Sequence, residues 1–150
     1  MTARDPFELQ RFVAAQAHGV HERALAEIRS GCKRSHWMWF EFPQLSGLGA
    51  SATSKRFGIS GLEEARAYLA HPVLGVRLHE CAEALAALDA HYSAAGIFKS
   101  PDDMKLRSSL TLFAQVAAPG SIFERLLERY FDGRRDEATL DRLGLTGRLS

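Results

Sequence analysis

The sequence signals the start of a helix at four separate places, and this repetition restricts the chain to a largely helical fold. Each signal places a side-chain oxygen where it can accept a hydrogen bond from the free N–H groups of a first helical turn. Two of the four also place a proline at the first helical position, where its missing N–H costs nothing. The four segments are Asp5-Pro-Phe-Glu8, Ser60-Gly-Leu-Glu63, Ser100-Pro-Asp-Asp103 and Ser121 to Glu124. We therefore expect an all-α protein.

Apolar residues recur between these starts at the spacing of a buried helix face. The clearest series, in alternating steps of four and three, is Leu74, Leu78, Cys81, Leu85 and Leu88. A short helix is expected from about Glu137 to Leu143, whereas Ser46–Ser54, rich in small residues, is expected to be a long surface loop. Residues 36–42 fit a helix or a strand. We predict one compact, orthogonal multi-helix domain of about six to seven helices over residues 1–150.

The composition agrees with a globular domain of ordinary size. The 150 residues are 46% hydrophobic and 25% charged, and the net charge is +1. Such a small net charge argues against nucleic acid or an anionic membrane as a partner. No apolar run is long enough to cross a membrane. Because two cysteines cannot form a disulfide framework and no signal peptide is visible, we expect reduced thiols and a cytoplasmic protein.

Residues 33–49 are the densest part of the sequence in side chains that both pack and bind. Both tryptophans lie here, after a group of cations and a histidine and before a Pro-Gln pair and a Gly-x-Gly. Tryptophan rings can stack on a nucleobase or a sugar, and cations bind phosphate groups. The candidate ligand-binding residues of this segment are Lys33, Arg34, His36, Trp37, Trp39 and Gln44. The alternative is that these large aromatic side chains fill the core of a helical domain.

The helix expected from Pro101 carries an unusual group of hydroxyl and cationic side chains at its centre. Lys105, Ser108 and Ser109 are candidates for a pocket, in which they would donate hydrogen bonds to a ligand. Serine and threonine prefer helix caps, so their place in mid-helix needs an explanation. The alternative explanation is that these hydroxyls donate to preceding carbonyls and that Asp103 and Arg107 form a surface ion pair.

Familiar catalytic and metal-binding motifs are absent from the sequence. His18 and His21 are three residues apart, and Cys32 and His36 are four apart, but neither pair has a second pair at zinc-like spacing. There is no Gly-x-Ser-x-Gly segment and no Gly-x-x-x-x-Gly-Lys-Ser/Thr phosphate loop. We therefore predict no metal site and no cofactor, and we assign no catalytic residue.

Long, unusual strings extend over nearly the whole chain. They are Asp5-Pro-Phe-x-Leu-x-Arg-Phe-Val13, Ser35-His-Trp-Met-Trp-Phe-x-Phe-Pro-Gln-Leu-x-Gly-Leu-Gly49, Ala65-Arg-Ala-Tyr-Leu-Ala-His-Pro-Val-Leu-Gly75 and Pro101-Asp-Asp-x-Lys-Leu-Arg-Ser-Ser109 with Thr111-Leu-Phe113. These strings resemble the bacterial family catalogued as domain of unknown function 1810, whose members are sometimes labelled calpastatin. The resemblance implies an all-α fold and no established activity. The chain departs from the family's pattern at Glu41, Lys99 and Leu110, where an apolar residue, glycine and methionine are expected.

Aromatic, cationic and hydroxyl side chains thus gather in two stretches, residues 33–49 and 101–111. If these stretches are neighbours in the fold, we expect them to form a site for a small anionic, nucleotide-like ligand derived from ADP-ribose or NAD. The hypothesis includes hydrolysis of that ligand as a second possibility. The NADAR group of ADP-ribose-linked N-glycosidases is similarly small, helical and rich in Trp, Phe and Lys, which points to the same ligand class without matching residues. The alternative hypothesis is a non-enzymatic protein-interaction or regulatory module that docks a protein partner on Ser46–Ser54 and its flanking cations.

Overall fold

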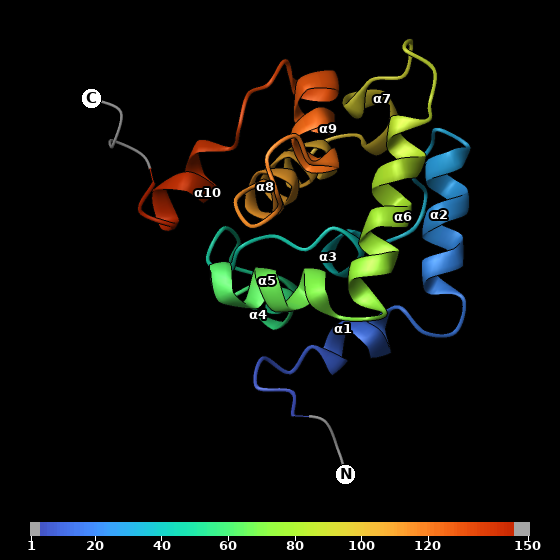
Figure 1. Ribbon diagram of the computed structural model, residues 1–150. Coiled ribbons are helices and arrows are strands. Elements are labelled where there is room, and N and C mark those ends of the chain that lie inside the picture. Colours follow the sequence, from blue (N-terminus) through green and yellow to red (C-terminus); the bar gives the residue numbers. More distant parts are fainter. Residues whose placement is uncertain (1–3, 146–150) are drawn as a thin grey trace.

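The computed structural model describes residues 4–145, and within them the chain forms ten helices and no strand (Figure 1). The helices are α1 (Gln10–Ala15), α2 (Val20–Arg29), α3 (Met38–Glu41), α4 (Ala52–Phe57), α5 (Leu62–Ala70), α6 (Leu74–Ala86), α7 (Ala94–Phe98), α8 (Asp102–Ala114), α9 (Ile122–Phe131) and α10 (Glu137–Arg142). The all-α prediction is confirmed, but the predicted number of about six to seven helices is too low. Over the described residues, every helix is too short or too polar to cross a membrane.

Three short helices account for the difference in number. α3 is one turn of the aromatic segment that fitted both a helix and a strand. α4 begins inside Ser46–Ser54, the segment predicted as a surface loop, and Ser51 caps it by accepting from the Ser54 amide. α7 is capped in the same way by Ser93. Helices of four to six residues span too few turns for an apolar period to become visible in the sequence.

Two of the predicted helix-start signals act at shifted positions. The Asp5 carboxylate accepts from the amides of Leu9 and Gln10, so α1 begins later than the proline that follows Asp5. At the start of α5, the amide and hydroxyl of Ser60 both donate to Glu64 rather than to the preceding glutamate. The side-chain chemistry of these two signals is therefore present, displaced by one residue at Glu64 and by about a turn at Asp5. The signal at Ser100-Pro-Asp-Asp103 differs, because α8 begins at Asp102 without a side-chain cap.

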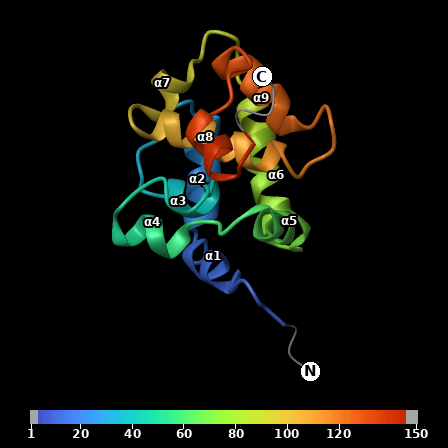
Figure 2. The same cartoon turned by 90° about the vertical axis from the view of Figure 1, so that its left-hand side faces the viewer.

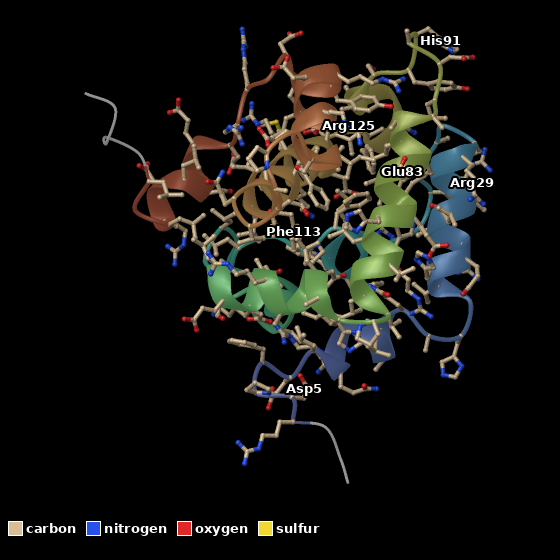
Figure 3. The ribbon with its side chains drawn as sticks, viewed as in Figure 1. Asp5, Arg29, Glu83, His91, Phe113 and Arg125 are labelled. Carbon is tan, nitrogen blue, oxygen red and sulfur yellow. The ribbon has the colours of Figure 1, made fainter. Side chains whose placement is uncertain are left out.

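The longer helices pack around a common core. α6 contacts α2, α5 and α9, and α8 contacts α5, α9 and α10. Figure 1 shows α2 and α6 side by side along one flank of the molecule, and Figure 2 shows α3 next to α4. In Figure 3 the ring of Phe113 lies inside the molecule, whereas Arg29 and His91 lie at its outside.

A continuous series of aromatic rings joins four helices within this core. Tyr68 of α5 contacts Phe12 of α1 and Phe113 of α8, with ring centroids 5.2 and 5.4 Å apart. Phe113 in turn contacts Phe123 of α9 at 5.8 Å. All four side chains are fully buried, and each burial stabilises the fold by roughly 1.5–3 kcal/mol. This series holds the first and last thirds of the chain together.

The junction between α5 and α6 is equally tight. α5 ends at Ala70, and the His71 Nδ1 accepts from the amides of Val73 and Leu74, where α6 begins. A Cβ atom at Gly75 would lie 2.0 Å from the carbonyl oxygen of Leu69. Glycine is therefore required for the close approach of the two helices.

Candidate functional site

The two stretches that the sequence singles out are neighbours in the fold. The Lys33 ammonium lies 2.8 Å from Oδ2 of Asp102, which links the segment before α3 to the start of α8. One turn further along α8, the Lys105 ammonium lies 4.1 Å above the centre of the Trp39 ring. The spatial condition for a shared site is therefore met.

A cavity of about 300 Å³ lies between these stretches, and we call it the Trp39–Lys105 cavity. Four of the predicted ligand-binding residues line it, namely Trp39, Gln44, Lys105 and Ser108. Its other lining residues are Leu48, Gly49, Pro101, Met104, Asp136 and Ala138. An aromatic face, a cation, an amide and a hydroxyl thus converge on one concave surface, which is the usual make-up of a small-molecule site.

The cations around the cavity are partly neutralised. Asp102 lies between Lys33 and Lys105, with its two oxygens 2.8 and 3.3 Å from the two ammonium groups. These three side chains carry two positive charges and one negative charge, so one positive charge remains. That balance suits a ligand with a single phosphate group better than a strongly anionic polymer.

The remaining predicted residues lie elsewhere. Trp37 is 1% exposed, packs against Phe42 and Phe98, and belongs to the core, so its ring has no free face for ligand stacking. Ser109 is fully buried, and its hydroxyl has no hydrogen-bond partner among the described residues. Arg34 and His36 are exposed and do not line the cavity. Lys33 does not line it either and is connected to Lys105 through Asp102, their shared ion-pair partner.

Two of the three hydroxyls in the middle of α8, those of Ser108 and Thr111, follow the alternative explanation, whereas that of Ser109 does not. Ser108 donates to the carbonyl four residues earlier at 3.2 Å, and Thr111 donates to that of Arg107 at 2.8 Å. The predicted ion pair of Arg107 with Asp103 is wrong, because Arg107 lies 3.7 Å from Asp136 instead. Asp136 precedes the first residue of α10, and the packing of α10 on α8 places its carboxylate next to Arg107. The spacing of residues within α8 cannot reveal such a contact.

Glu27 of α2 organises the segment that leads into α3, and sequence reasoning missed it. Its carboxylate accepts hydrogen bonds from the amides of Arg34 and Ser35, the Ser35 hydroxyl and the Trp37 indole, at 2.6–2.9 Å. Burial raises the pKa of the Glu27 carboxyl, but these hydrogen bonds outweigh it and lower the pKa from 4.5 to about 2. Glu27 therefore fixes where the aromatic segment begins.

A second polar cluster lies in the core, and we call it the His21 cluster, consisting of His21, Glu41, Glu80 and Cys81. Nδ1 of His21 lies 2.8 Å from Oε1 of Glu41, and its Nε2 lies 3.1 Å from Oε1 of Glu80. The Cys81 thiol donates to the same Oε1 of Glu41 at 3.8 Å. Oε2 of Glu41 is buried and has no partner among the described residues.

The environment of the His21 cluster shifts two pKa values upward. Burial disfavours the imidazolium, but hydrogen bonds from His21 to Glu41 and Glu80 outweigh it and raise the pKa of His21 above 6.5. Burial and the neighbouring Glu41 carboxylate raise the pKa of the Cys81 thiol well above its ordinary value. The sequence offered one signal for this cluster, the carboxylate at Glu41 in place of an expected apolar residue.

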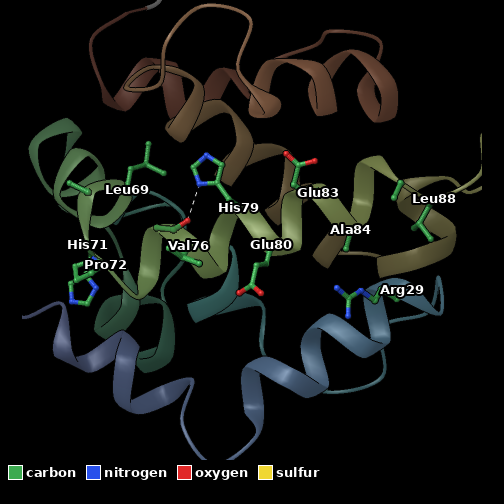
Figure 4. Close-up of a pocket in the computed structure, with 13 residues that line it drawn as sticks. Arg29, Leu69, His71, Pro72, Val76, His79, Glu80, Glu83, Ala84 and Leu88 are labelled. Atoms are coloured by element: carbon green, nitrogen blue, oxygen red, sulfur yellow. Dashed lines mark hydrogen bonds between the residues drawn. The ribbon is translucent and has the colours of Figure 1, made fainter.

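A larger groove of about 1080 Å³ runs along α6. Figure 4 shows Glu80 on the side of α6 that faces α2, whereas His79 and Glu83 point to the other side. Glu80 belongs both to this groove and to the His21 cluster, and the apolar part of the groove includes Val76, which is 58% exposed. We call this surface the α6 groove, and its lining residues are Arg29, Leu69, Ala70, His71, Pro72, Gly75, Val76, His79, Glu80, Glu83, Ala84, Ala87 and Leu88.

Comparison with known proteins connects the chain to proteins without an assigned activity. Residues 6–143 match a family described as "Protein of unknown function (DUF1810)". The chain is similar to the conserved hypothetical protein Rv1873 from Mycobacterium tuberculosis, with 50% sequence identity over 95% of this chain and 100% of that one, and a TM-score of 0.90. No curated protein matches the sequence.

Proposed function

The chain belongs to the DUF1810 family of proteins of unknown function, and from its geometry we propose that it binds a small anionic, nucleotide-like ligand in the Trp39–Lys105 cavity. The observation that carries the proposal is the Lys105 ammonium 4.1 Å above the Trp39 ring within that cavity. The Trp39 ring supplies an aromatic surface for stacking, and Lys105, whose ammonium lies over one face of that ring, supplies a positive charge. Gln44 offers both a donor and an acceptor for the edge of a base or sugar.

The size of the cavity limits what it can enclose. Ligand pockets span roughly 300–1,000 Å³, so the Trp39–Lys105 cavity is at the small end of the range. A nucleobase or a ribose phosphate fits this size, whereas a whole ADP-ribose or NAD molecule would leave one half outside. We therefore expect a mononucleotide or one end of a dinucleotide to be the bound part.

The carboxylates beside the cavity favour binding over hydrolysis. Asp136 uses Oδ2 to accept from the amide and hydroxyl of Thr139 at the start of α10, and its Oδ1 pairs with Arg107. Asp102 is shared between two lysines. General-base catalysis needs a carboxylate oxygen that is free to face the substrate, and both carboxylates are already engaged by these hydrogen bonds and ion pairs.

A thermal-shift series tests the proposal. The wild-type protein is heated with AMP, ADP-ribose, NAD, ribose 5-phosphate, adenosine and inorganic phosphate, beside Lys105→Ala and Trp39→Ala. A ligand at a hundred times its dissociation constant stabilises the fold by about 2.7 kcal/mol. We expect a shift with AMP or ADP-ribose that both variants lose.

Lys55→Ala is the matched control, because Lys55 is an exposed lysine on α4 outside the cavity. It should keep the full shift. A shift that persists in both Lys105→Ala and Trp39→Ala would place the ligand elsewhere, and a response to phosphate equal to that of AMP would remove the stacking role of Trp39.

The alternative function is a protein-interaction module, and the exposed Val76 in the α6 groove is the observation that favours it. The sequence placed the docking surface at Ser46–Ser54, where Ser51 instead caps α4. Absence of a thermal shift with every compound above is the result that would favour this alternative.

A further inference from the structure

We propose that His21, Glu41 and Cys81 form a site for a zinc-class transition-metal ion in the core. The three residues come from α2, α3 and α6, and their ligand atoms all lie within 4.8 Å of one another. All three are at least nine-tenths buried, with exposed fractions of 5%, 1% and 0%. The proposal is independent of the Trp39–Lys105 cavity, which shares none of these residues.

One of the separations between the ligand atoms is close to that of a tetrahedral metal site, and a second is about half an ångström shorter. Zinc bonds of about 2.0–2.1 Å to nitrogen and oxygen and 2.3 Å to sulfur place neighbouring ligand atoms about 3.3–3.7 Å apart. Sγ of Cys81 lies 3.8 Å from Oε1 of Glu41, while Nδ1 of His21 lies 2.8 Å from the same oxygen. A metal ion therefore requires His21 and Glu41 to separate by about half an ångström, as their hydrogen bond is replaced by two metal bonds.

The kinds of ligand select the class of metal. Imidazole and thiolate suit zinc and its neighbours, whereas magnesium and calcium prefer shells made of oxygen ligands. One thiolate, one carboxylate and a neutral imidazole balance the two positive charges of a divalent ion. A neutral assembly avoids the large cost of leaving an uncompensated charge in the core.

Glu80 supplies the outer support that metal-binding histidines commonly have. Such a histidine donates its second ring N–H to a carboxylate, which fixes both the tautomer and the orientation of the ring. Nε2 of His21 lies 3.1 Å from Oε1 of Glu80, on the side of the ring opposite Glu41. With the proton on Nε2, the lone pair of Nδ1 is directed at the place where the metal would lie.

The unpaired oxygen of Glu41 is an independent observation for a ligand here. Oε1 accepts from both His21 and Cys81, yet Oε2 is buried without any partner in the described part of the chain. Leaving a charged oxygen buried and unpaired is costly, because the protein does not replace the hydrogen bonds that water supplied. A His–Glu ion pair alone accounts for Oε1 and leaves Oε2 unexplained, whereas a metal ion can be bound by either oxygen or by both.

Metal binding at this site is balanced by proton release. The Cys81 thiol loses its proton to form a metal–sulfur bond, and a proton on Nδ1 of His21 is also lost. Both protons leave to solvent, and no electron is transferred. The measured affinity should therefore increase with pH.

Cobalt(II) is the probe for the test, because a cobalt–thiolate bond gives a charge-transfer absorption in the near ultraviolet. The full-length protein is stripped with a chelator, reduced, and titrated with cobalt(II). We expect saturation at one ion per chain with a thiolate band, and loss of that band when zinc is added. No thiolate band, or binding too weak to compete with a mild chelator, would overturn the proposal.

Variants locate the site. Cys81→Ala should remove the thiolate band, whereas Cys32→Ala, which removes the other thiol, should retain it. Glu80→Gln alters a half-exposed side chain, so it tests the site without disturbing the core, and it should weaken cobalt binding about 10- to 100-fold. Retention of the band in Cys81→Ala together with its loss in Cys32→Ala would contradict the assignment, as would unchanged affinity in Glu80→Gln.

Discussion

The Trp39–Lys105 cavity and the His21 cluster both include a residue from the single turn of α3. They differ in how far their charged groups are exposed to solvent. Trp39 and Lys105 are partly exposed and lie beside an open cavity. Glu41, two residues after Trp39, is 1% exposed and depends on His21 and Cys81 for its partners. A charge at the cavity can be rehydrated when its partner is removed, whereas a charge in the cluster cannot. The two sites should therefore differ in what mutation does to stability.

The largest loss of stability is expected from substitution of Glu41 in the metal-free protein. Glu41→Ala leaves Nδ1 of His21 without a partner and opens a space in the core, and we expect a loss of about 3 kcal/mol in the free energy of unfolding. Glu41→Leu also leaves Nδ1 of His21 without its partner, but it fills most of that space, so its loss should be smaller, about 1–2 kcal/mol. Urea unfolding in the presence of a chelator measures both values.

The two variants show whether Glu41 is required for the stability of the fold or for another role. If leucine is tolerated nearly as well as glutamate, the carboxylate is retained for a role other than folding, in agreement with a metal ligand. If both substitutions cost about 3 kcal/mol, the His21–Glu41 pair itself holds the fold together. Equal and negligible losses would contradict the burial and pairing of Glu41.

A smaller effect is expected at Glu27, which supports the segment entering α3 and hence both sites. Its hydrogen bonds to Arg34, Ser35 and Trp37 favour the ionised form in the folded state. Glu27→Gln keeps the shape but loses the charge, and we expect it to cost about 1–2 kcal/mol at neutral pH. Chemical unfolding of the variant and the wild type gives the difference.

The effect of Glu27 should depend on pH with a defined sign. Because the pKa of its carboxyl falls from an ordinary value of 4.5 to about 2 on folding, the stabilisation is fully present above pH 4.5 and is lost as the pH falls toward 2. The difference in the free energy of unfolding between the wild type and Glu27→Gln should therefore become smaller as the pH falls from 4.5 to about 2. Glu22→Gln removes the charge of an exposed glutamate on the same helix and is the variant against which Glu27→Gln is compared. If that difference in free energy stays constant from neutral pH to about pH 2, the ionised form of Glu27 does not account for the stabilisation.

The residues of the cavity could be predicted because they are close together in the sequence. Trp39 and Gln44 belong to one dense segment, and Lys105 and Ser108 lie one turn apart on one helix, so chemistry and spacing identified them. Trp37 was wrongly included as a stacking residue, because sequence cannot tell which of two neighbouring tryptophans a four-residue helix will bury. Asp136 was missed because it reaches the cavity from the start of α10.

The His21 cluster could not be predicted in this way. His21, Glu41 and Cys81 are separated by twenty and forty residues, and no local spacing relates them. Cys81 was assigned correctly to the buried face of α6, but an apolar stripe does not show which polar groups it will meet. Only the packing of α2 and α3 on α6 brings the three ligands together.

Among these substitutions, those at Lys105 should have the smallest effect on stability. They should have the largest effect on ligand binding, because Lys105 lines the Trp39–Lys105 cavity. Lys105→Ala removes a cation over Trp39 and an ion pair with Asp102 at a partly exposed position, so it should cost less than about 1 kcal/mol. Lys105→Met keeps most of the apolar stem over the ring without the charge, and should be nearly neutral. If the cavity binds an anion, both variants lose the thermal shift with AMP although they differ in stability. A Lys105→Met protein that keeps the shift would show that Lys105 acts by packing on Trp39, and the ligand would then be recognised by stacking rather than by charge.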